Sequence, residues 1–131
     1  AKYARENKIP YLGLCLGMQI MTIEFARHVL NNPKITSEEF DEQNLIDKSN
    51  YIIHFMPGLS KERDKGGTLR LGAYPCKITK GTKTYNLYKK TLIDERHRHR
   101  YEFNNSYKKI LEEKGMIFPG IYEKANLVEI A

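Results

Sequence analysis

The most informative part of this chain is the segment Ile9-Pro-Tyr-Leu-Gly-Leu-Cys15-Leu-Gly-Met-Gln19. It opens with a short apolar run, residues 11–14, which has the length and character of a buried parallel strand. Apolar residues then recur every three or four positions over residues 18–29, a spacing that predicts a helix. Cys15 stands between the two, with one glycine two residues before it and another two residues after. The order strand, Gly-x-Cys-x-Gly, helix is typical of a nucleophile elbow.

The elbow gives Cys15 a chemical role that suits its place. A sharp strand-to-helix turn pushes the side chain clear of the sheet, and we expect Gly13 and Gly17 to relieve the crowding on either side. The positive end of the helix dipole would stabilise a thiolate, and the amide of Leu16 would donate to an oxyanion. A small structural cysteine buried at such a turn is the alternative, and the motif alone does not separate the two.

Longer stretches of the sequence carry a family resemblance. Residues 10–19 resemble the nucleophile segment of class I, triad-type glutamine amidotransferases. Gly66-Gly67-Thr68-Leu69-Arg70-Leu71-Gly72 and Glu95-Arg96-His97-Arg98-His99-Arg100-Tyr101-Glu102-Phe103-Asn104 resemble the amidotransferase domain of the CTP synthase family. The resemblance covers essentially all 131 residues and is weakest over residues 44–64. It implies a flavodoxin-like α/β fold, with a mainly parallel sheet flanked by helices.

The same resemblance implies a site that acts on the side-chain amide of L-glutamine. Cys15 would be the nucleophile, giving a glutamyl thioester and ammonia. Glu39 would hold the ammonium group of the substrate and Arg100 its α-carboxylate, although the sequence alone does not distinguish Glu38 from Glu39. The glutamine-binding residues implied in this way are Leu16, Gly17, Met18, Gln19, Glu39 and Arg100.

The basic run over residues 96–100 admits three interpretations. His97 and His99 could chelate a metal ion, but the three flanking guanidiniums would repel a divalent cation, so we expect no metal. The arginines could form a nucleic-acid patch. One arginine could instead clamp the carboxylate of a small substrate with two parallel hydrogen bonds, and the resemblance gives this role to Arg100.

The resemblance also implies functional parts that this sequence does not contain. In the family, a His-x-Glu pair that supplies the base follows the strand expected at residues 127–130, and an upstream glycine loop supplies a second oxyanion amide. We therefore expect residues 1–131 to be a partial amidotransferase domain, incomplete at both ends. The whole enzyme would pass ammonia to a synthetase domain of the same chain, which aminates UTP to CTP with ATP and Mg²⁺ under activation by GTP. A cytoplasmic homo-tetramer is implied.

Composition bounds the other possibilities. The 22 basic and 16 acidic residues give a net charge of +6, so a non-catalytic basic module that binds nucleic acid is one rival. A different cysteine hydrolase of the same fold, such as a peptidase or γ-glutamyl hydrolase, is another. No apolar run reaches membrane-spanning length, and two cysteines make no disulfide framework, so we expect no membrane contact and a reducing compartment.

The remaining pattern predicts a chain of short elements. A helix is expected to end before Pro10, and a charged loop precedes the turn at Gly66-Gly67. Cys76 is expected to be structural. The expected elements are strands at 51–56 and 68–73, a second strand around Cys76, a turn at 85–90, a strand at 101–104, a helix ending at Lys114 and paired strands at 116–122 and 127–130.

Overall fold

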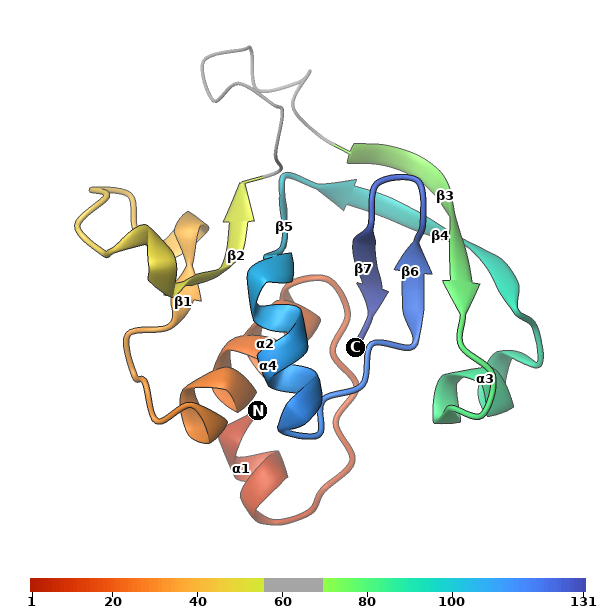
Figure 1. Cartoon of the computed structure of the whole chain (residues 1–131), viewed down its shortest axis with the longest axis horizontal. Helices are drawn as coiled ribbons and strands as arrows, with labels where there is room; N and C mark the ends of the chain where they lie inside the picture. Colours follow the sequence, from red (N-terminus) through yellow and green to blue (C-terminus); the bar gives the residue numbers. More distant parts are fainter. Residues whose placement is uncertain (56–69) are drawn as a thin grey trace.

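The structure is a computed structural model that describes residues 1–55 and 70–131, and its strands form two sheets (Figure 1). The turn at Gly66-Gly67, the charged loop before it and the first two residues of the strand expected at 68–73 lie outside the described residues. Met56, expected to end the strand at 51–56, also lies outside them.

The first sheet has the strand order β1-β2-β5. Its strands are β1 (Thr36–Ser37), β2 (Tyr51–Phe55) and β5 (Tyr101–Phe103). β1 and β2 run parallel, whereas β2 and β5 are antiparallel with Ile53 opposite Phe103. β5 pairs with β2 in this sheet, so the strand expected at 51–56 is confirmed over residues 51–55 and the one expected at 101–104 over residues 101–103.

The second sheet has the order β4-β3-β6-β7, with antiparallel pairing throughout. Its strands are β3 (Arg70–Ile78), β4 (Leu92–His99), β6 (Gly120–Tyr122) and β7 (Leu127–Ile130). β3 is one continuous strand where the sequence predicted two around Pro75. The proline is tolerated because β6 pairs only with Lys77 and Ile78, so β3 has a neighbour on one side alone at that position.

The α/β class is confirmed, but the pairing is less parallel than expected. Among the described strands, only β1 and β2 are parallel neighbours. Consecutive strands that fold back on each other, as β6 and β7 do, must pair antiparallel. The prediction of a buried strand over residues 11–14 is wrong. These residues belong to no helix or strand, and Leu12 is 84% and Leu14 75% exposed. An apolar run becomes a strand only where a neighbour pairs with it, and no described strand does so.

The described residues form four α-helices. They are α1 (Lys2–Glu6), α2 (Leu16–Val29), α3 (Lys83–Tyr88) and α4 (Lys108–Glu113), with single 3₁₀ turns at 38–40, 48–50 and 105–107. α2 starts immediately after Cys15, as predicted. α3 replaces the turn expected at 85–90, because the Thr82 hydroxyl accepts a hydrogen bond from the amide of Tyr85 and caps a helix there. Gly115, at φ 98°, follows α4 as its predicted cap.

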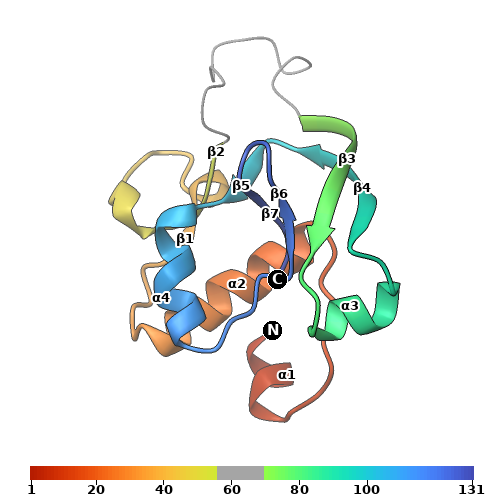
Figure 2. The same cartoon turned by 45° about the vertical axis from the view of Figure 1, so that its right-hand side comes forward.

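The core lies between α2, α4 and the strands β2, β5 and β7. In both views, the two helices lie together below these strands (Figures 1 and 2). The buried residues that form it are Ile23, Ala26, Ile35, Ile52, Ile53, Phe103, Leu111, Phe118 and Val128. Each fully buried large aliphatic side chain contributes about 1.5–3 kcal/mol, so this cluster fixes α2 and the elbow against the sheet.

Candidate active site

Cys15 sits on a strained turn at the head of α2. Its backbone dihedrals are φ 53° and ψ −115°, a conformation that residues with a side chain rarely adopt. The side chain is exposed. The next amide, Leu16 N–H, opens the helix and makes no hydrogen bond to another described residue. The turn and the helix of the predicted elbow are therefore present without the strand expected before them, and they place an accessible thiol beside an available amide.

The two glycines of the motif do different work. A Cβ on Gly13 would lie 2.5 Å from the backbone carbon of Gly17, so no side chain fits at position 13 without moving the turn. A Cβ on Gly17 would meet only the Tyr11 hydroxyl, at 3.6 Å, which is an ordinary contact. The same hydroxyl donates to the carbonyl of Gly17 at 3.1 Å. The expectation that both glycines relieve crowding thus holds for Gly13 and is wrong for Gly17.

A cavity of about 270 Å³ opens beside the thiol. This volume is just below the range of cavities that hold drug-sized ligands, so a molecule as small as an amino acid suits it. Five predicted site residues meet there, although they come from three parts of the chain. The residues that line it are Cys15, Leu16, Gln19, Glu39, Arg98, His99, Arg100 and Tyr101. Met18 lines a smaller adjoining cavity that also contains Cys15 and Gln19, and Gly17 lines neither.

The structure separates the two acids that the sequence could not. The Glu38 carboxylate accepts a hydrogen bond from the amide of Phe55 at 2.7 Å, which ties it to the end of β2. Glu39 instead lines the cavity and is exposed. The Ser37 hydroxyl accepts from the Glu39 amide at 3.2 Å and fixes the 3₁₀ turn that presents this carboxylate. Glu39 is therefore the acid placed to meet a cationic ligand group.

The positively charged groups of the cavity come from the junction of β4 and β5. Arg98, His99, Arg100 and Tyr101 all line the cavity at this junction. The Gln19 side chain donates to the carbonyl of Tyr101 at 3.4 Å, linking α2 to the same segment. The cavity thus combines guanidinium groups and a carboxylate around one thiol, a combination that matches a zwitterion with an electrophilic carbon.

Behind this wall lies a buried network of charged side chains. Arg70 of β3 donates to Glu102 of β5 at 3.4 Å and pairs with Glu129 of β7. The second carboxylate oxygen of Glu129, whose side chain is fully buried, pairs with Nε2 of His97. The two Nδ1 atoms of His97 and His99 are 3.2 Å apart.

Burial and charge in this network shift the pKa values of Glu102 and His99. Burial raises the pKa of the Glu102 carboxyl, while the charge and hydrogen bond of Arg70 act against this shift. Burial lowers the pKa of His99, and the positive charges of His97 and Arg70 lower it further. His99 is therefore a neutral ring at the cavity wall.

Sequence reasoning did not assign His99 or Arg98 to the cavity, nor the network behind it to any role. A signal was present, since His97 and His99 are two residues apart and lie on one face of a strand. Arg70, Glu102 and Glu129 gave no such signal, because they come from three other strands.

Cys76, unlike Cys15, is shielded from solvent. It is fully buried within β3, as the sequence predicted for a structural cysteine. Burial, and next the negative charges of Glu129 and Glu95, raise the pKa of its thiol to about 12. Since the thiolate is the nucleophile, Cys76 is inert at neutral pH.

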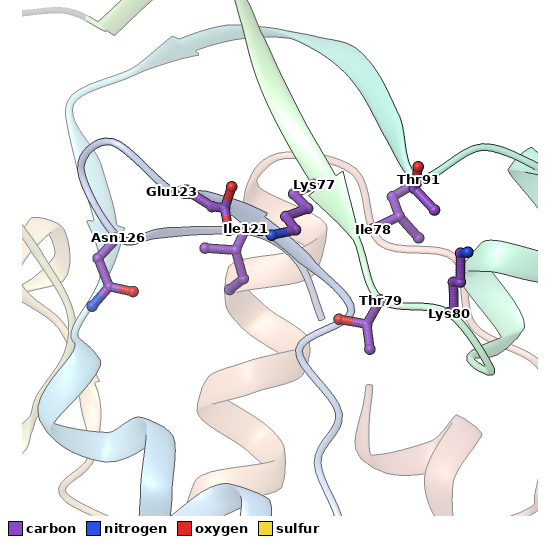
Figure 3. A pocket seen from close by; sticks show the side chains of 8 residues that line it. All are labelled: Lys77, Ile78, Thr79, Lys80, Thr91, Ile121, Glu123 and Asn126. Atoms are coloured by element: carbon purple, nitrogen blue, oxygen red, sulfur yellow. Dashed lines mark hydrogen bonds and ion pairs between the residues drawn. The ribbon is translucent and has the colours of Figure 1, made fainter.

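A larger cavity, of about 670 Å³, lies along β3 and β6 (Figure 3). Two of its charged side chains pair with each other, Lys77 with Glu123 at 2.6 Å. Neither cysteine nor any histidine lines it. It therefore offers room without a nucleophile, and the candidate chemistry lies at the elbow.

Within residues 1–55 and 70–131, no helix has both the length and the apolar character needed to cross a membrane. No group of three or more His, Cys, Asp or Glu side chains in this part of the chain is arranged to hold a metal ion.

Comparison with known proteins extends these findings. The sequence pattern of the family described as glutamine amidotransferase class-I matches residues 1–130. The CTP synthase of Mesoplasma florum is 56% identical over 131 residues, covering 99% of this chain and 24% of the relative. The CTP synthase of Chlorobaculum tepidum is 52% identical over 129 residues, covering 98% of this chain and 22% of the relative. The chain thus spans under a quarter of the length of these curated relatives.

A solved structure is also similar. The glutaminase domain of Trypanosoma brucei CTP synthase with bound acivicin superposes with a TM-score of 0.78 at 32% identity. The match covers 98% of this chain and 47% of that one.

Proposed function

Because this chain belongs to the class-I glutamine amidotransferase family, we propose that Cys15 attacks the side-chain amide of L-glutamine and releases ammonia. The observation that carries the proposal is the single cavity shared by Cys15, Glu39 and Arg100. Similarity to a glutaminase domain that binds acivicin supports it.

The chemistry follows from the groups around the thiol. The Cys15 sulfur adds to the amide carbon, and the carbonyl oxygen takes up the negative charge. Leu16 N–H donates to this oxyanion, a contribution that is typically worth about 3–4 kcal/mol in related chemistry. Collapse of the intermediate expels ammonia, which takes up a proton, and leaves a glutamyl thioester. Attack by water then gives glutamate and restores the thiol.

The other cavity residues bind the amino-acid end of the substrate. Glu39 accepts hydrogen bonds from the ammonium group, and Arg100 clamps the α-carboxylate with two parallel hydrogen bonds. Gln19 lines the cavity itself. Gly17 and Met18 stand beside it, Gly17 as the anchor of the turn and Met18 in the adjoining cavity. The base that takes the thiol proton and the carboxylate that orients it are assigned to a His-x-Glu pair elsewhere in the whole protein, on family resemblance.

The whole protein, we infer, is a CTP synthase. Relatives of that name match nearly all of this chain at 52–56% identity. On this inference the ammonia passes to a synthetase domain of the same polypeptide, where UTP is aminated with ATP and Mg²⁺. Activation by GTP, assembly as a homo-tetramer and a cytoplasmic location are parts of the same proposal, as is the absence of a nucleic-acid partner.

Replacing the nucleophile tests the proposal. In the whole protein, Cys15→Ala should abolish CTP formation from glutamine, because no thiol remains to form the thioester. CTP formation from added ammonia should persist, since the ammonia bypasses the elbow. Cys76→Ala is the matched control and should retain both activities. Loss of both activities in a folded Cys15→Ala protein would contradict the proposal.

Removing the clamp tests the substrate. Arg100→Ala should raise the KM for glutamine about ten- to hundredfold, because a charge-assisted pair to the carboxylate is lost. The turnover number should fall much less. Arg96→Ala is the control, since Arg96 lies four residues earlier on β4, is exposed and does not line the cavity. A large fall in turnover with an unchanged KM would count against the clamp.

A further inference from the structure

The place of Glu39 in the substrate cavity depends on the backbone turn that carries it. Within residues 1–55 and 70–131, its carboxylate makes no hydrogen bond or ion pair with another side chain or with the backbone. An exposed glutamate side chain samples several rotamers, so the position of its Cα decides where the carboxylate can reach. Whatever fixes this turn therefore affects how well the cavity holds a cationic group.

Glu38 ties the turn to β2. The strand β1 ends at Ser37, which pairs with Ile53 of β2. Directly after it, the Glu38 carboxylate accepts a hydrogen bond from the amide of Phe55, two residues further along β2, at 2.7 Å. Hydrogen bonds from a backbone amide to a carboxylate are among the stronger ones in proteins. The Glu38 side chain thus continues the contact between the two strands beyond the end of β1.

A second tie fixes the other end of the turn. The Asp41 carboxylate accepts a hydrogen bond from the Tyr51 hydroxyl at 2.6 Å. Tyr51 begins β2 and Phe55 ends it, and the first three residues of this strand are buried. The turn at 38–40 is therefore attached to the two ends of one well-packed strand. Of the three acids at positions 38, 39 and 41, Glu39 alone lines the cavity.

We propose that Glu38 is a positioning residue of the glutamine site: its bond to the Phe55 amide holds the turn from which Glu39 reaches the ammonium group of the substrate. The proposal rests on the proposed glutaminase function, in which Glu39 binds that group. Glu38 does not line the cavity, so it acts on the substrate through its neighbour. Position 38 then needs an acceptor oxygen, whereas position 39 needs a negative charge.

The same substitution at the two adjacent positions separates an acceptor from a charge. In the whole protein, Glu38→Gln keeps an oxygen that accepts from the Phe55 amide, so the KM for glutamine should stay within about threefold of the wild type. Glu39→Gln removes the charge that meets the ammonium group, and the KM should rise about ten- to hundredfold. Glu38→Ala removes the acceptor, and the KM should rise about three- to tenfold at nearly unchanged turnover, because the turn is no longer held.

Two more variants control this comparison. Glu42→Ala removes an exposed acid of the same segment that does not line the cavity, and its KM should be that of the wild type. Adding Glu38→Ala to Glu39→Ala should raise the KM no further than Glu39→Ala alone, because no carboxylate is left to position. Thermal unfolding and ammonia-dependent CTP formation verify that each variant is folded.

The other outcomes overturn the proposal. An equal rise of the KM in Glu38→Gln and Glu39→Gln would mean that the substrate meets the charge of Glu38 itself. A normal KM in Glu38→Ala would mean that the bond to Phe55 is not needed. A further rise of the KM in the double variant, or a fall in turnover alone in Glu38→Ala, would mean that Glu38 does not act through Glu39. Failure of the wild type to hydrolyse glutamine would instead refute the proposed function.

A structure of the whole protein as its Cys15→Ala variant with bound glutamine gives a test that needs no change at Glu38. The Glu39 carboxylate should lie at a hydrogen-bonding distance of about 2.7–3.2 Å from the ammonium nitrogen, while Glu38 keeps its bond to the Phe55 amide. A Glu38 carboxylate turned away from Phe55 and toward the ammonium group would overturn the proposal.

Discussion

Cys15 and Cys76 are the same side chain in two regions of one small fold. Cys15 follows an exposed apolar run, adopts a strained backbone conformation and opens a 14-residue helix. Cys76 lies in the middle of an extended strand, fully buried, and burial raises the pKa of its thiol to about 12. The backbone turn and the exposure, not the residue type, therefore make one thiol a candidate nucleophile and leave the other inert.

Each cysteine region also depends on a glycine. The first glycine lets the backbone turn close, and the second leaves room for a buried side chain. Gly13 lets the turn at Cys15 close on the backbone of Gly17. Gly120 leaves room for the sulfur of Cys76, because a Cβ there would lie 2.8 Å from Sγ. We therefore expect the first glycine to matter for activity and the second for packing.

The largest effect should come from a methyl group at the elbow. Gly13→Ala places a Cβ 2.5 Å from backbone that cannot move without displacing Cys15 and Leu16. A misplacement of about 1 Å at a reacting centre can cost about a hundredfold in rate, and we expect at least that loss in kcat/KM for glutamine. Gly17→Ala should cost far less, since its Cβ meets an ordinary contact at 3.6 Å. Glutaminase assays of the two variants measure this difference. Equal losses of kcat/KM would contradict the separate roles of the two glycines.

A smaller effect, on stability alone, should come from the buried region. Gly120→Ala forces a Cβ against Cys76 and Ile130, both at 2.8 Å, and overpacking of this kind costs about 1–3 kcal/mol. Adding Cys76→Ala removes the sulfur, so the double variant should be more stable than the sum of the two single changes predicts. Denaturant unfolding of the four proteins gives this coupling. Strict additivity would show that the sulfur and the glycine do not share the space.

The sequence predicted the turn at Cys15 and α2 from a local pattern, and the family resemblance led us to expect Glu39 and Arg100 near the thiol, where both line the cavity. It did not predict the exposure of residues 11–14, since an apolar run carries no information about whether another strand pairs with it. It also missed the network of Arg70, His97 and Glu129, whose members meet only through strand pairing. Arg70 stands opposite His99 in the register of β3 and β4, and such a register is not written in local sequence.

The comparison of the two thiols has one direct test. The whole protein would be treated with 6-diazo-5-oxo-norleucine, an electrophile that mimics glutamine, and the modified peptide identified by mass spectrometry. We expect an adduct on Cys15 that excess glutamine prevents, with Cys76 unmodified while the protein is folded. Modification of Cys76 in preference to Cys15, or loss of glutaminase activity with Cys15 untouched, would contradict this expectation.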